Sequence, residues 1–253
     1  MRLGLSSVLF SSAPVAERTP EVVARRCREL GFTAVELRPD YLQEQNVAPG
    51  AVRQILRSQG LDLVYATGTQ LVDCPYQPAD PHNPLRLDFS VASMLGADIL
   101  RIFPGDLARR GASSSTAARA WGAFAVAEGR RLVLENPGSG PGSDPVELGR
   151  FVREIGVGMG LNFDVGNAAQ AGLEPAATLA KVLRVTAMLH LKDFAPGDSR
   201  GANIPLGAGV VDFAAVARVL VDWSGTAFLE VDAGAQLWTT LESWERWLRA
   251  VGF

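Results

Sequence analysis

Strand patterns and helix patterns alternate along this whole chain, and the alternation restricts the folds open to it more than any other feature. Strands that alternate with helices are the signature of a parallel sheet. We count eight such repeats in 253 residues, close to the roughly 250 residues that a single (β/α)8 barrel needs. No stretch of the sequence has the character of a linker. We therefore expect one domain over residues 1–253, an α/β chain folded as a (β/α)8 TIM barrel.

Glycines, prolines and short polar residues set the expected element boundaries. The expected strands are 3–10, 34–38, 62–66, 99–103, 131–135, 160–164, 188–192 and 227–231. The expected helices begin near residues 20, 49, 84, 116, 145, 175, 212 and 239. Two long loops, 67–84 and 193–211, exceed the usual length of a strand-to-helix connection. In a barrel, such loops build the active-site face.

The net charge and the cysteine content exclude several classes of function. A charge of −3 and an isoelectric point of about 5.5 do not suit a nucleic-acid partner, which requires a basic face. No apolar run approaches the roughly 18 residues of a membrane span. Two cysteines, Cys27 and Cys74, are too few for a disulfide framework and fit a reducing compartment. We therefore expect a cytoplasmic protein with no nucleic-acid partner and no membrane partner.

Four polar residues in the second half of the chain each stand where a short apolar strand ends. They are Glu135, Asp164, His190 and Glu230. Successive members are separated by about one strand-plus-helix unit, so a parallel barrel would bring them together at one rim. Carboxylate oxygens suit Mn²⁺ or Mg²⁺, and imidazole also accepts Co²⁺ or Zn²⁺. The sequence thus predicts a divalent-metal site and, with it, an enzyme.

The alternation of side chains across a strand predicts which way these residues point. Each has apolar neighbours that need helices to cover them, so the polar side chain must face the barrel axis. The same reasoning applies to Glu36, Arg101 and Lys192. A structural ion-pair network is the alternative reading, because unpaired buried charge is costly. Arg101, Lys192 or Arg200 would then be the counter-ions.

Five segments occur in an order that resembles one known family. They are LENP (134–137), FDVGN (163–167), HLKD (190–193), PLGAGVVDF (205–213) and FLEVD (228–232). Over its whole length the chain resembles the xylose isomerase-like TIM barrel superfamily, specifically the sugar phosphate isomerase/epimerase group. Members of that group include ketose 3-epimerases, hydroxypyruvate isomerases and inosose dehydratases.

The resemblance implies one divalent metal per chain, most often Mn²⁺, bound by Glu135, Asp164, His190 and Glu230. It also implies that Glu135 and Glu230 are the catalytic acid–base pair. The metal would polarise a carbonyl and its neighbouring hydroxyl, which stabilises the ene-diolate formed when one Glu removes a proton. Return of a proton to the opposite face of that carbon gives an epimer. Return to the adjacent carbon gives an aldose–ketose isomer.

Two positions depart from the best-known epimerases of the family. Asn167 stands where they often have a histidine, and Asn can hydrogen-bond a hydroxyl but neither takes up nor gives up a proton at pH 7. Arg200 lies further from His190 than their substrate-binding Arg does, in a Gly-rich loop that would suit a carboxylate or a phosphate. The other histidine, His82, is expected on a surface loop. The predicted substrate-binding residues are Asn167, Arg200, Lys192, Arg101 and Glu36.

Three functions stay open from the sequence. The first is a metal-dependent isomerase or epimerase of a small ketose or keto acid. The second is a dehydratase of a polyol ketone such as an inosose, in which Lys192 or Asp193 would assist the leaving hydroxyl. The third is a non-catalytic sugar-binding barrel, which the presence of both Glu135 and Glu230 disfavours. The sequence leaves open the sugar, its phosphorylation, the native metal, and whether the chain forms the homo-oligomers that many relatives form.

Overall fold

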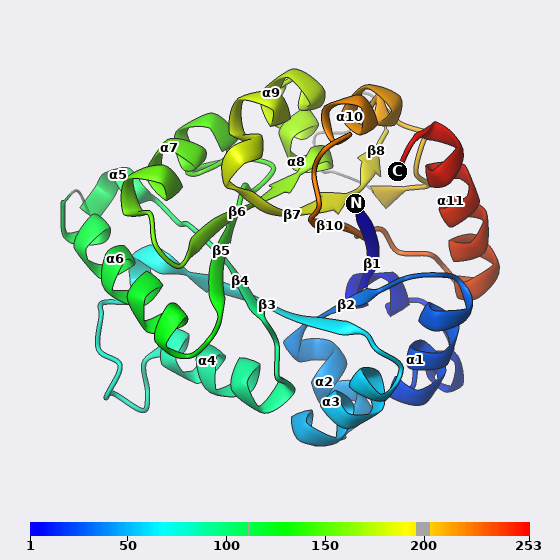
Figure 1. Ribbon diagram of the computed structural model, residues 1–253, viewed down its shortest axis with the longest axis horizontal. Helices are drawn as coiled ribbons and strands as arrows, with labels where there is room; N and C mark the ends of the chain where they lie inside the picture. Colours follow the sequence, from blue (N-terminus) through cyan, green and yellow to red (C-terminus); the bar gives the residue numbers. More distant parts are fainter. Residues whose placement is uncertain (111, 196–202) are drawn as a thin grey trace.

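Eight parallel strands close into a barrel around which the chain runs once (Figure 1). The structure is a computed structural model that describes residues 1–110, 112–195 and 203–253. Around the barrel the order is β1-β10-β7-β6-β5-β4-β3-β2, so each strand pairs with its neighbours in the chain. The strands are β1 (Arg2–Ser6), β2 (Ala34–Leu37), β3 (Asp62–Gln70), β4 (Ile99–Phe103), β5 (Arg131–Glu135), β6 (Met159–Asp164), β7 (Thr186–Leu191) and β10 (Thr226–Leu229). The predicted (β/α)8 barrel is confirmed.

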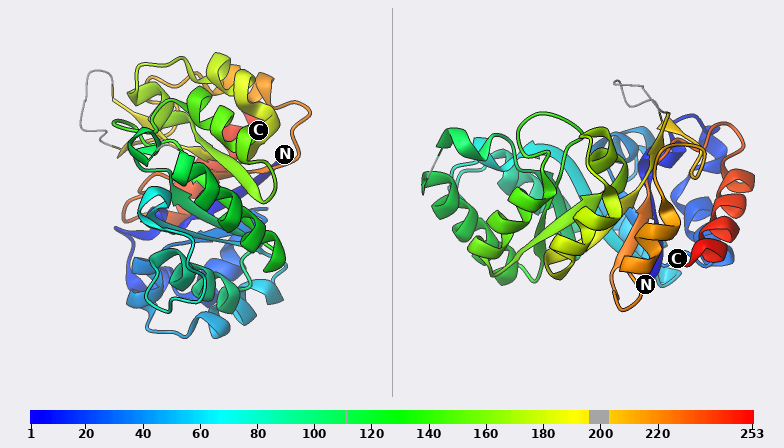
Figure 2. Two further views of the ribbon diagram at one scale, coloured as in Figure 1. Left: turned by 90° about the vertical axis from the view of Figure 1, so that its left-hand side faces the viewer. Right: turned by 90° about the horizontal axis from the view of Figure 1, so that it is seen from above.

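Helices cover the outside of the barrel between successive strands (Figures 1 and 2). The side chains of Thr19, Asn83 and Asp144 accept backbone N–H groups at three helix starts, and a proline follows each of them. A polar cap followed by proline satisfies the first backbone donors and presets the helical φ angle. The covering helices are α1 (Pro20–Glu29), α3 (Pro49–Ser58), α4 (Pro84–Leu95), α6 (Ala112–Ala127), α7 (Pro145–Ile155), α9 (Pro175–Val182), α10 (Phe213–Val219) and α11 (Leu237–Val251).

Several short elements were not predicted from the sequence. Each has seven residues or fewer, too few for a helical period to stand out. They are the helices α2 (Pro39–Gln45), α5 (Leu107–Arg110) and α8 (Val165–Gln170), the 3-10 turns η1 (Ser7–Phe10), η2 (Val15–Glu17), η3 (Leu71–Asp73) and η4 (Leu183–Val185), and the antiparallel pair β8 (Asp193–Phe194) and β9 (Asn203–Ile204). Most of them follow a barrel strand, where loops can carry functional groups.

The prediction for the first strand was wrong at its end. Residues 7–10 form η1 instead of extending β1. Phe10 is fully buried there, with its ring 5.7 Å from that of Tyr41 and 6.3 Å from that of Trp238. A short apolar run fits either a strand or a buried turn, so contacts from distant parts of the chain decide between them.

The barrel interior is apolar toward its N-terminal end and polar toward its C-terminal end. Gly4 leaves room for the ring of Phe228, because a Cβ there would lie 2.7 Å from it. The apolar layer consists of Ala34, Val64, Val133, Met188 and Phe228. The buried polar residues above it include Ser6, Glu36, Arg101, Glu135, Asn162, Asp164, His190 and Glu230. The polar end is the one at which barrel enzymes place their active sites.

Among the described residues, no helix combines the length and the apolar character that crossing a membrane requires.

Helix α8 lies directly against the end of β7, because it begins where β6 ends. Asp164 is its N-cap and accepts the backbone N–H of Asn167 at 2.8 Å. At Gly166 an added Cβ would lie 2.4 Å from Cγ of Lys192 and 2.9 Å from its carbonyl oxygen. The glycine of FDVGN therefore allows a close approach that a side chain would prevent.

Gly166→Ala should lower the free energy of unfolding by about 1–3 kcal/mol, because the methyl group pushes α8 away from Lys192. Gly50→Ala is the matched control. An added Cβ at Gly50, in α3, has no described atom within 4 Å, so stability should stay the same or rise slightly. Urea unfolding measures both. Equal midpoints for the two variants would show that the close approach does not constrain the fold.

Candidate metal centre and active site

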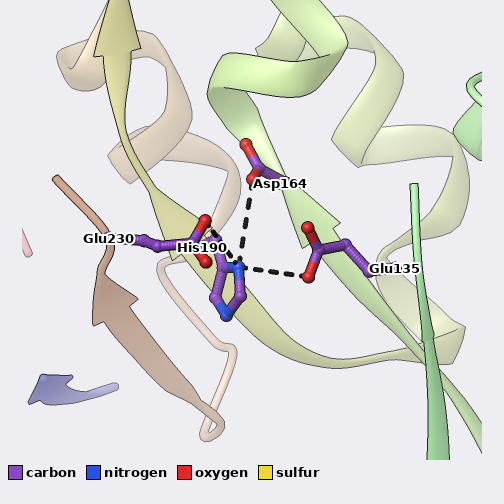
Figure 3. A group of neighbouring side chains, drawn as sticks. All are labelled: Glu135, Asp164, His190 and Glu230. Carbon is purple, nitrogen blue, oxygen red and sulfur yellow. Dashed lines mark ion pairs between the residues drawn. The ribbon is translucent and has the colours of Figure 1, made fainter. Parts of the chain in front are cut away.

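Four neighbouring strands of the barrel carry the predicted metal ligands. Glu135 and Asp164 are the last residues of β5 and β6. His190 lies near the end of β7, and Glu230 directly follows β10. Figure 3 shows the four side chains directed toward one another. Each residue is at most 6 % exposed, so the four form one buried cluster at the mouth of the barrel.

Nδ1 of His190 lies at the centre of the cluster. It is 3.1 Å from Oε2 of Glu230, 3.3 Å from Oε2 of Glu135 and 3.9 Å from Oδ2 of Asp164 (Figure 3). One ligand atom from each of the four residues can be chosen so that all lie within 4.8 Å of one another. Atoms this close can share a single cation.

Two atoms of the cluster need a partner. Among the residues that the structure describes, Nδ1 of His190 and Oδ2 of Asp164 are buried without a hydrogen bond, although both form ion pairs, Nδ1 with Glu135 and Glu230 and Oδ2 with Lys192. A buried polar atom without a hydrogen bond costs about 1–3 kcal/mol and often marks the place of an ion. Three carboxylates and one imidazole suit Mn²⁺ and tolerate Co²⁺ or Zn²⁺. The residues present therefore fit a divalent cation.

Two cations balance part of the buried negative charge. Nε of Arg101 lies 3.0 Å from Oε2 of Glu135, and Nζ of Lys192 lies 2.9 Å from Oδ2 of Asp164. With Glu36, the cluster holds four buried carboxylates. Arg101 and Lys192 neutralise two of them, and Glu230 also has the partly exposed Arg38 at 3.9 Å. With a neutral His190 the buried groups therefore keep an excess of negative charge, which a bound divalent cation would offset.

The surrounding charges set the protonation of His190 and Glu230. Burial disfavours the charged imidazole, but the carboxylates of Glu230, Glu36 and Glu135 outweigh it and raise the pKa of His190 well above its usual value. Burial acts to raise the pKa of Glu230, but the charges of His190 and Lys192 hold it well below its usual value. The metal-free site therefore keeps a proton on His190 at neutral pH, and a metal must displace it.

Asp164 and Lys192 influence each other at the mouth. Burial raises the pKa of Asp164 to about 6, and the charge of Lys192 offsets part of this effect. Burial disfavours the charged form of Lys192, but Asp164 and Glu230 outweigh it and raise the pKa of Lys192 above its usual value. Lys192 is therefore a fixed positive charge at neutral pH.

Three asparagines hold the carboxylates in place. Asn162 and Asn167 donate from Nδ2 to the two oxygens of Glu135, at 3.0 and 3.3 Å. Asn136 donates to the carbonyl oxygen of Asp164 at 3.2 Å and accepts its backbone N–H at 2.9 Å. Sequence reasoning missed Asn136 and Asn162. The second could have been found, because it stands two residues before Asp164 and so faces the axis with it.

A second buried layer lies against the other side of His190. Its Nε2 is 2.9 Å from Oε2 of Glu36, and Oγ of Ser6 donates to Oε1 of Glu36 at 2.8 Å. Nη1 of Arg101 donates to the carbonyl oxygen of Thr67 at 3.2 Å. Ser6, Glu36 and Arg101 are at most 2 % exposed. The structure thus places Glu36 and Arg101, two of the predicted substrate-binding residues, beneath the metal ligands.

The other predicted substrate-binding residues have different positions. The side chain of Lys192 is 21 % exposed at the mouth. Asn167 is buried, with its amide directed at Glu135 and at the carbonyl oxygen of Asn136. Arg200 lies outside the residues that the structure describes. His82, expected on the surface, is exposed.

Asp193 anchors the segment that follows β9. It is fully buried, and its carboxylate accepts the backbone N–H groups of Gly207, Gly209 and Val211 at 3.1, 2.9 and 3.2 Å. These residues belong to the PLGAGVVDF segment. The bonds engage both carboxylate oxygens in holding the backbone, so Lys192 is the better placed of the two residues considered for assisting a leaving group.

The sequence matches a protein-family model over most of its length. The model of the xylose isomerase-like TIM barrel matches residues 24–250. This chain belongs to that family. The matched range includes all four residues of the buried cluster, and the superfamily predicted from the five segments is confirmed. A search of the curated proteins finds no match.

Similar solved structures have the same fold. The probable 3-DHS dehydratase AsbF from Bacillus anthracis has a TM-score of 0.74 at 15 % identity, over 98 % of this chain and 99 % of that chain. A D-psicose 3-epimerase studied with D-fructose has a TM-score of 0.70 at 14 % identity, over 96 % and 90 %. A xylose isomerase domain protein from Planctomyces limnophilus has a TM-score of 0.70 at 18 % identity, over 99 % and 96 %. At these identities the likeness establishes the fold.

Mn²⁺ added to chelator-treated protein at pH 7.5 should bind at about one equivalent and release about one proton, because the metal displaces the proton of His190. Titration calorimetry in two buffers of different ionisation enthalpy measures the released proton. The His190→Ala variant should bind Mn²⁺ more weakly and release less than one proton for each bound ion. Tight binding without proton release would show that His190 is not a ligand.

Proposed function

We propose that this protein is a divalent-metal-dependent isomerase or epimerase that moves a proton next to the carbonyl of a small ketose or keto acid. The observation that supports this most directly is the placement of Glu135 and Glu230. They approach Nδ1 of His190 from opposite sides, at 3.3 and 3.1 Å (Figure 3). A substrate held between them would present one face to each carboxyl group, as proton transfer between two faces requires.

Each group of the site has a defined task in this reaction. When bound, a divalent cation polarises the carbonyl and the neighbouring hydroxyl of the substrate. Glu230 removes the proton. Nζ of Lys192 at 3.6 Å and Nη1 of Arg38 at 3.9 Å favour its ionised form. Glu135 carries the proton that is added from the other side, and exchange of both carboxyl groups with solvent resets the pair after turnover. Asn162 keeps the carboxyl group of Glu135 oriented.

The carbon that receives the proton decides the product. Return to the same carbon from the opposite face inverts it and gives an epimer. Return to the adjacent carbon gives an aldose–ketose isomer. Asn167 neither takes up nor gives up a proton at pH 7, so both transfers depend on the two carboxyl groups.

A cavity at the C-terminal ends of β3, β4 and β5 has a size suited to a small polyhydroxy substrate. Its volume is about 350 Å³, within the size range of small-molecule sites. Pro137, one of its lining residues, stands two residues after Glu135. Its lining combines polar groups that can bind hydroxyls with one aromatic ring, and consists of Gln70, Phe103, Gly105, Asp106, Pro137, Ser139 and Pro141.

A dehydratase is the second candidate, and Lys192 is the residue that favours it. The ammonium group stays charged at neutral pH because its acidic neighbours outweigh burial and raise its pKa. Such a cation can hydrogen-bond the oxygen of a leaving β-hydroxyl after the same proton abstraction. The similar structure of AsbF is described as that of a probable dehydratase, so both reactions are compatible with this fold.

The metal and the location belong to the same proposal. We favour Mn²⁺ because three of the four ligands are carboxylates. A cytoplasmic location stays a prediction that rests on the two free cysteines, Cys27 and Cys74. Formation of a homo-oligomer stays an open expectation.

Glu230→Gln should lower turnover at least about 100-fold, because an amide does not accept the proton. The unfolding midpoint should stay near that of the wild type. Glu242→Gln, on the exposed face of α11, is the matched control and should keep full activity. Bound Mn²⁺ has to be measured in both variants, because Glu230 is also a proposed ligand. Normal turnover by metal-loaded Glu230→Gln would refute its role as the base.

Mn²⁺-loaded protein in D2O should introduce deuterium next to the carbonyl of its substrate. A panel of small ketoses and keto acids, analysed by mass spectrometry, tests this. An isomerase or epimerase gives a deuterated product with otherwise unchanged composition. A dehydratase gives a product that has lost water and absorbs in the ultraviolet through conjugation. Binding of these compounds without either change would identify a non-catalytic barrel.

A further inference from the structure

Glu36 is a buried acidic residue that neither metal ligation nor proton transfer explains. It lies on β2 and is fully buried. Oε2 lies 2.9 Å from Nε2 of His190, and Oε1 accepts a hydrogen bond from Oγ of Ser6 at 2.8 Å. Nη2 of Arg101 lies 3.9 Å from Oε1. A carboxylate without solvent is costly unless it is well paired, so its contacts define what it does.

We infer that Glu36 is a positioning residue that selects the tautomer of His190, keeping the hydrogen on Nε2 and directing the lone pair of Nδ1 into the cluster of Glu135, Asp164 and Glu230. The inference rests on the metal-binding part of the proposed function. In this inference the partner of Glu36 is His190, whereas the sequence predicted a contact between Glu36 and the substrate.

The chemistry of imidazole leads to this assignment. A neutral imidazole has one nitrogen that donates and one that accepts. An ionised carboxylate only accepts, so the nitrogen beside Glu36 must carry the hydrogen. The lone pair of the neutral ring then belongs to Nδ1, the nitrogen that faces Glu135, Asp164 and Glu230 at 3.1 to 3.9 Å. In the other tautomer, Nδ1–H would donate to Glu135 or Glu230, and the lone pair would point away from the cluster.

A charge-balancing role toward Arg101 is the competing explanation. The distances favour His190, because Nη2 of Arg101 is 3.9 Å from Glu36 while its Nε is 3.0 Å from Glu135. Ser6 is a neutral donor, so it fixes one oxygen of Glu36 and leaves the charge intact for Nε2. A carboxylate behind a metal-binding histidine orients the ring and raises its basicity as a ligand.

The chain suits a direct measurement of this tautomer, because it contains only two histidines, His82 and His190. Selective ¹⁵N-histidine labelling therefore gives two imidazole spin systems, and exposed His82 is an internal reference. In Zn²⁺-loaded wild-type protein, long-range ¹H–¹⁵N spectra should show His190 bound through Nδ1, with its Nε2 hydrogen signal shifted downfield by the hydrogen bond to Glu36. His82 should show the averaged signals of a solvated ring.

Glu36→Gln is the main variant, because the amide carries a donor as well as an acceptor and does not distinguish the tautomers. It should weaken Mn²⁺ binding about 10–100-fold and move the Nε2 hydrogen signal of His190 upfield in the Zn²⁺-loaded protein, because an amide oxygen is a weaker acceptor than a carboxylate. Ser6→Ala, a milder change, should shift both readings in the same direction by a smaller amount. Glu242→Gln on the exposed face of α11 should change neither.

The outcomes separate this inference from the proposed function. Weaker Mn²⁺ binding with a changed His190 spectrum in folded Glu36→Gln supports the inference. Wild-type affinity and an unchanged Nε2 hydrogen signal overturn it and leave the metal-dependent enzyme intact. If Glu36→Gln does not fold, the same two readings on Ser6→Ala decide. Wild-type protein that binds neither Zn²⁺ nor Mn²⁺ overturns the metal site itself.

Discussion

Repulsion between buried carboxylates is the constraint on which the rest of this barrel depends. Glu36, Glu135, Asp164 and Glu230 surround one imidazole ring out of contact with bulk water. Like charges repel more strongly there than in water, so each carboxylate needs a cation or a donor close by. Arg101 and Lys192 supply the cations, and Ser6, Asn162 and Asn167 supply the donors. The polar interior is thus one connected network, and a change at one position alters the charge balance of the others.

The apolar layer below makes this network effective. On β5, Val133 precedes Glu135 by two residues and faces the axis one layer lower, and Met188 stands in the same relation to His190 on β7. A strand with a repeat of two thus supplies both a hydrophobic plug and a polar group above it. The plug lowers the local dielectric beneath the cluster, which strengthens the contacts of the cluster with charged and polar partners.

Sequence reasoning succeeded where the structure follows from local periodicity. The alternation of strands and helices predicted the barrel. The alternation of side chains along a strand predicted that Glu135 and His190 face the barrel axis, because the direction of a side chain depends only on its adjacent residues. It failed where contacts between distant segments decide, as in residues 7–10, which form a turn packed on Tyr41 and Trp238.

The sequence also did not predict which residue an inward-facing side chain would contact. Glu36 and His190 were both expected at the axis, yet their contact joins residues 154 positions apart on strands that are not neighbours in the sheet. Depth in the barrel depends on strand tilt and register, which no short segment encodes. The substrate-binding role predicted for Glu36 therefore rested only on the expected direction of its side chain toward the barrel axis.

The anchoring of the backbone by Asp193 has a consequence for how such a barrel can be adapted. Asp193 follows His190 by three residues, and its carboxylate fixes the backbone at Gly207, Gly209 and Val211. The pairing of β8 with β9 joins Phe194 to Asn203. The bonds of Asp193 run to backbone N–H groups, so they do not depend on the side chains at the exposed positions Ala208 and Val210. A protein engineer can exchange those side chains while the anchoring persists, and natural variants can diversify there in the same way without rebuilding the barrel.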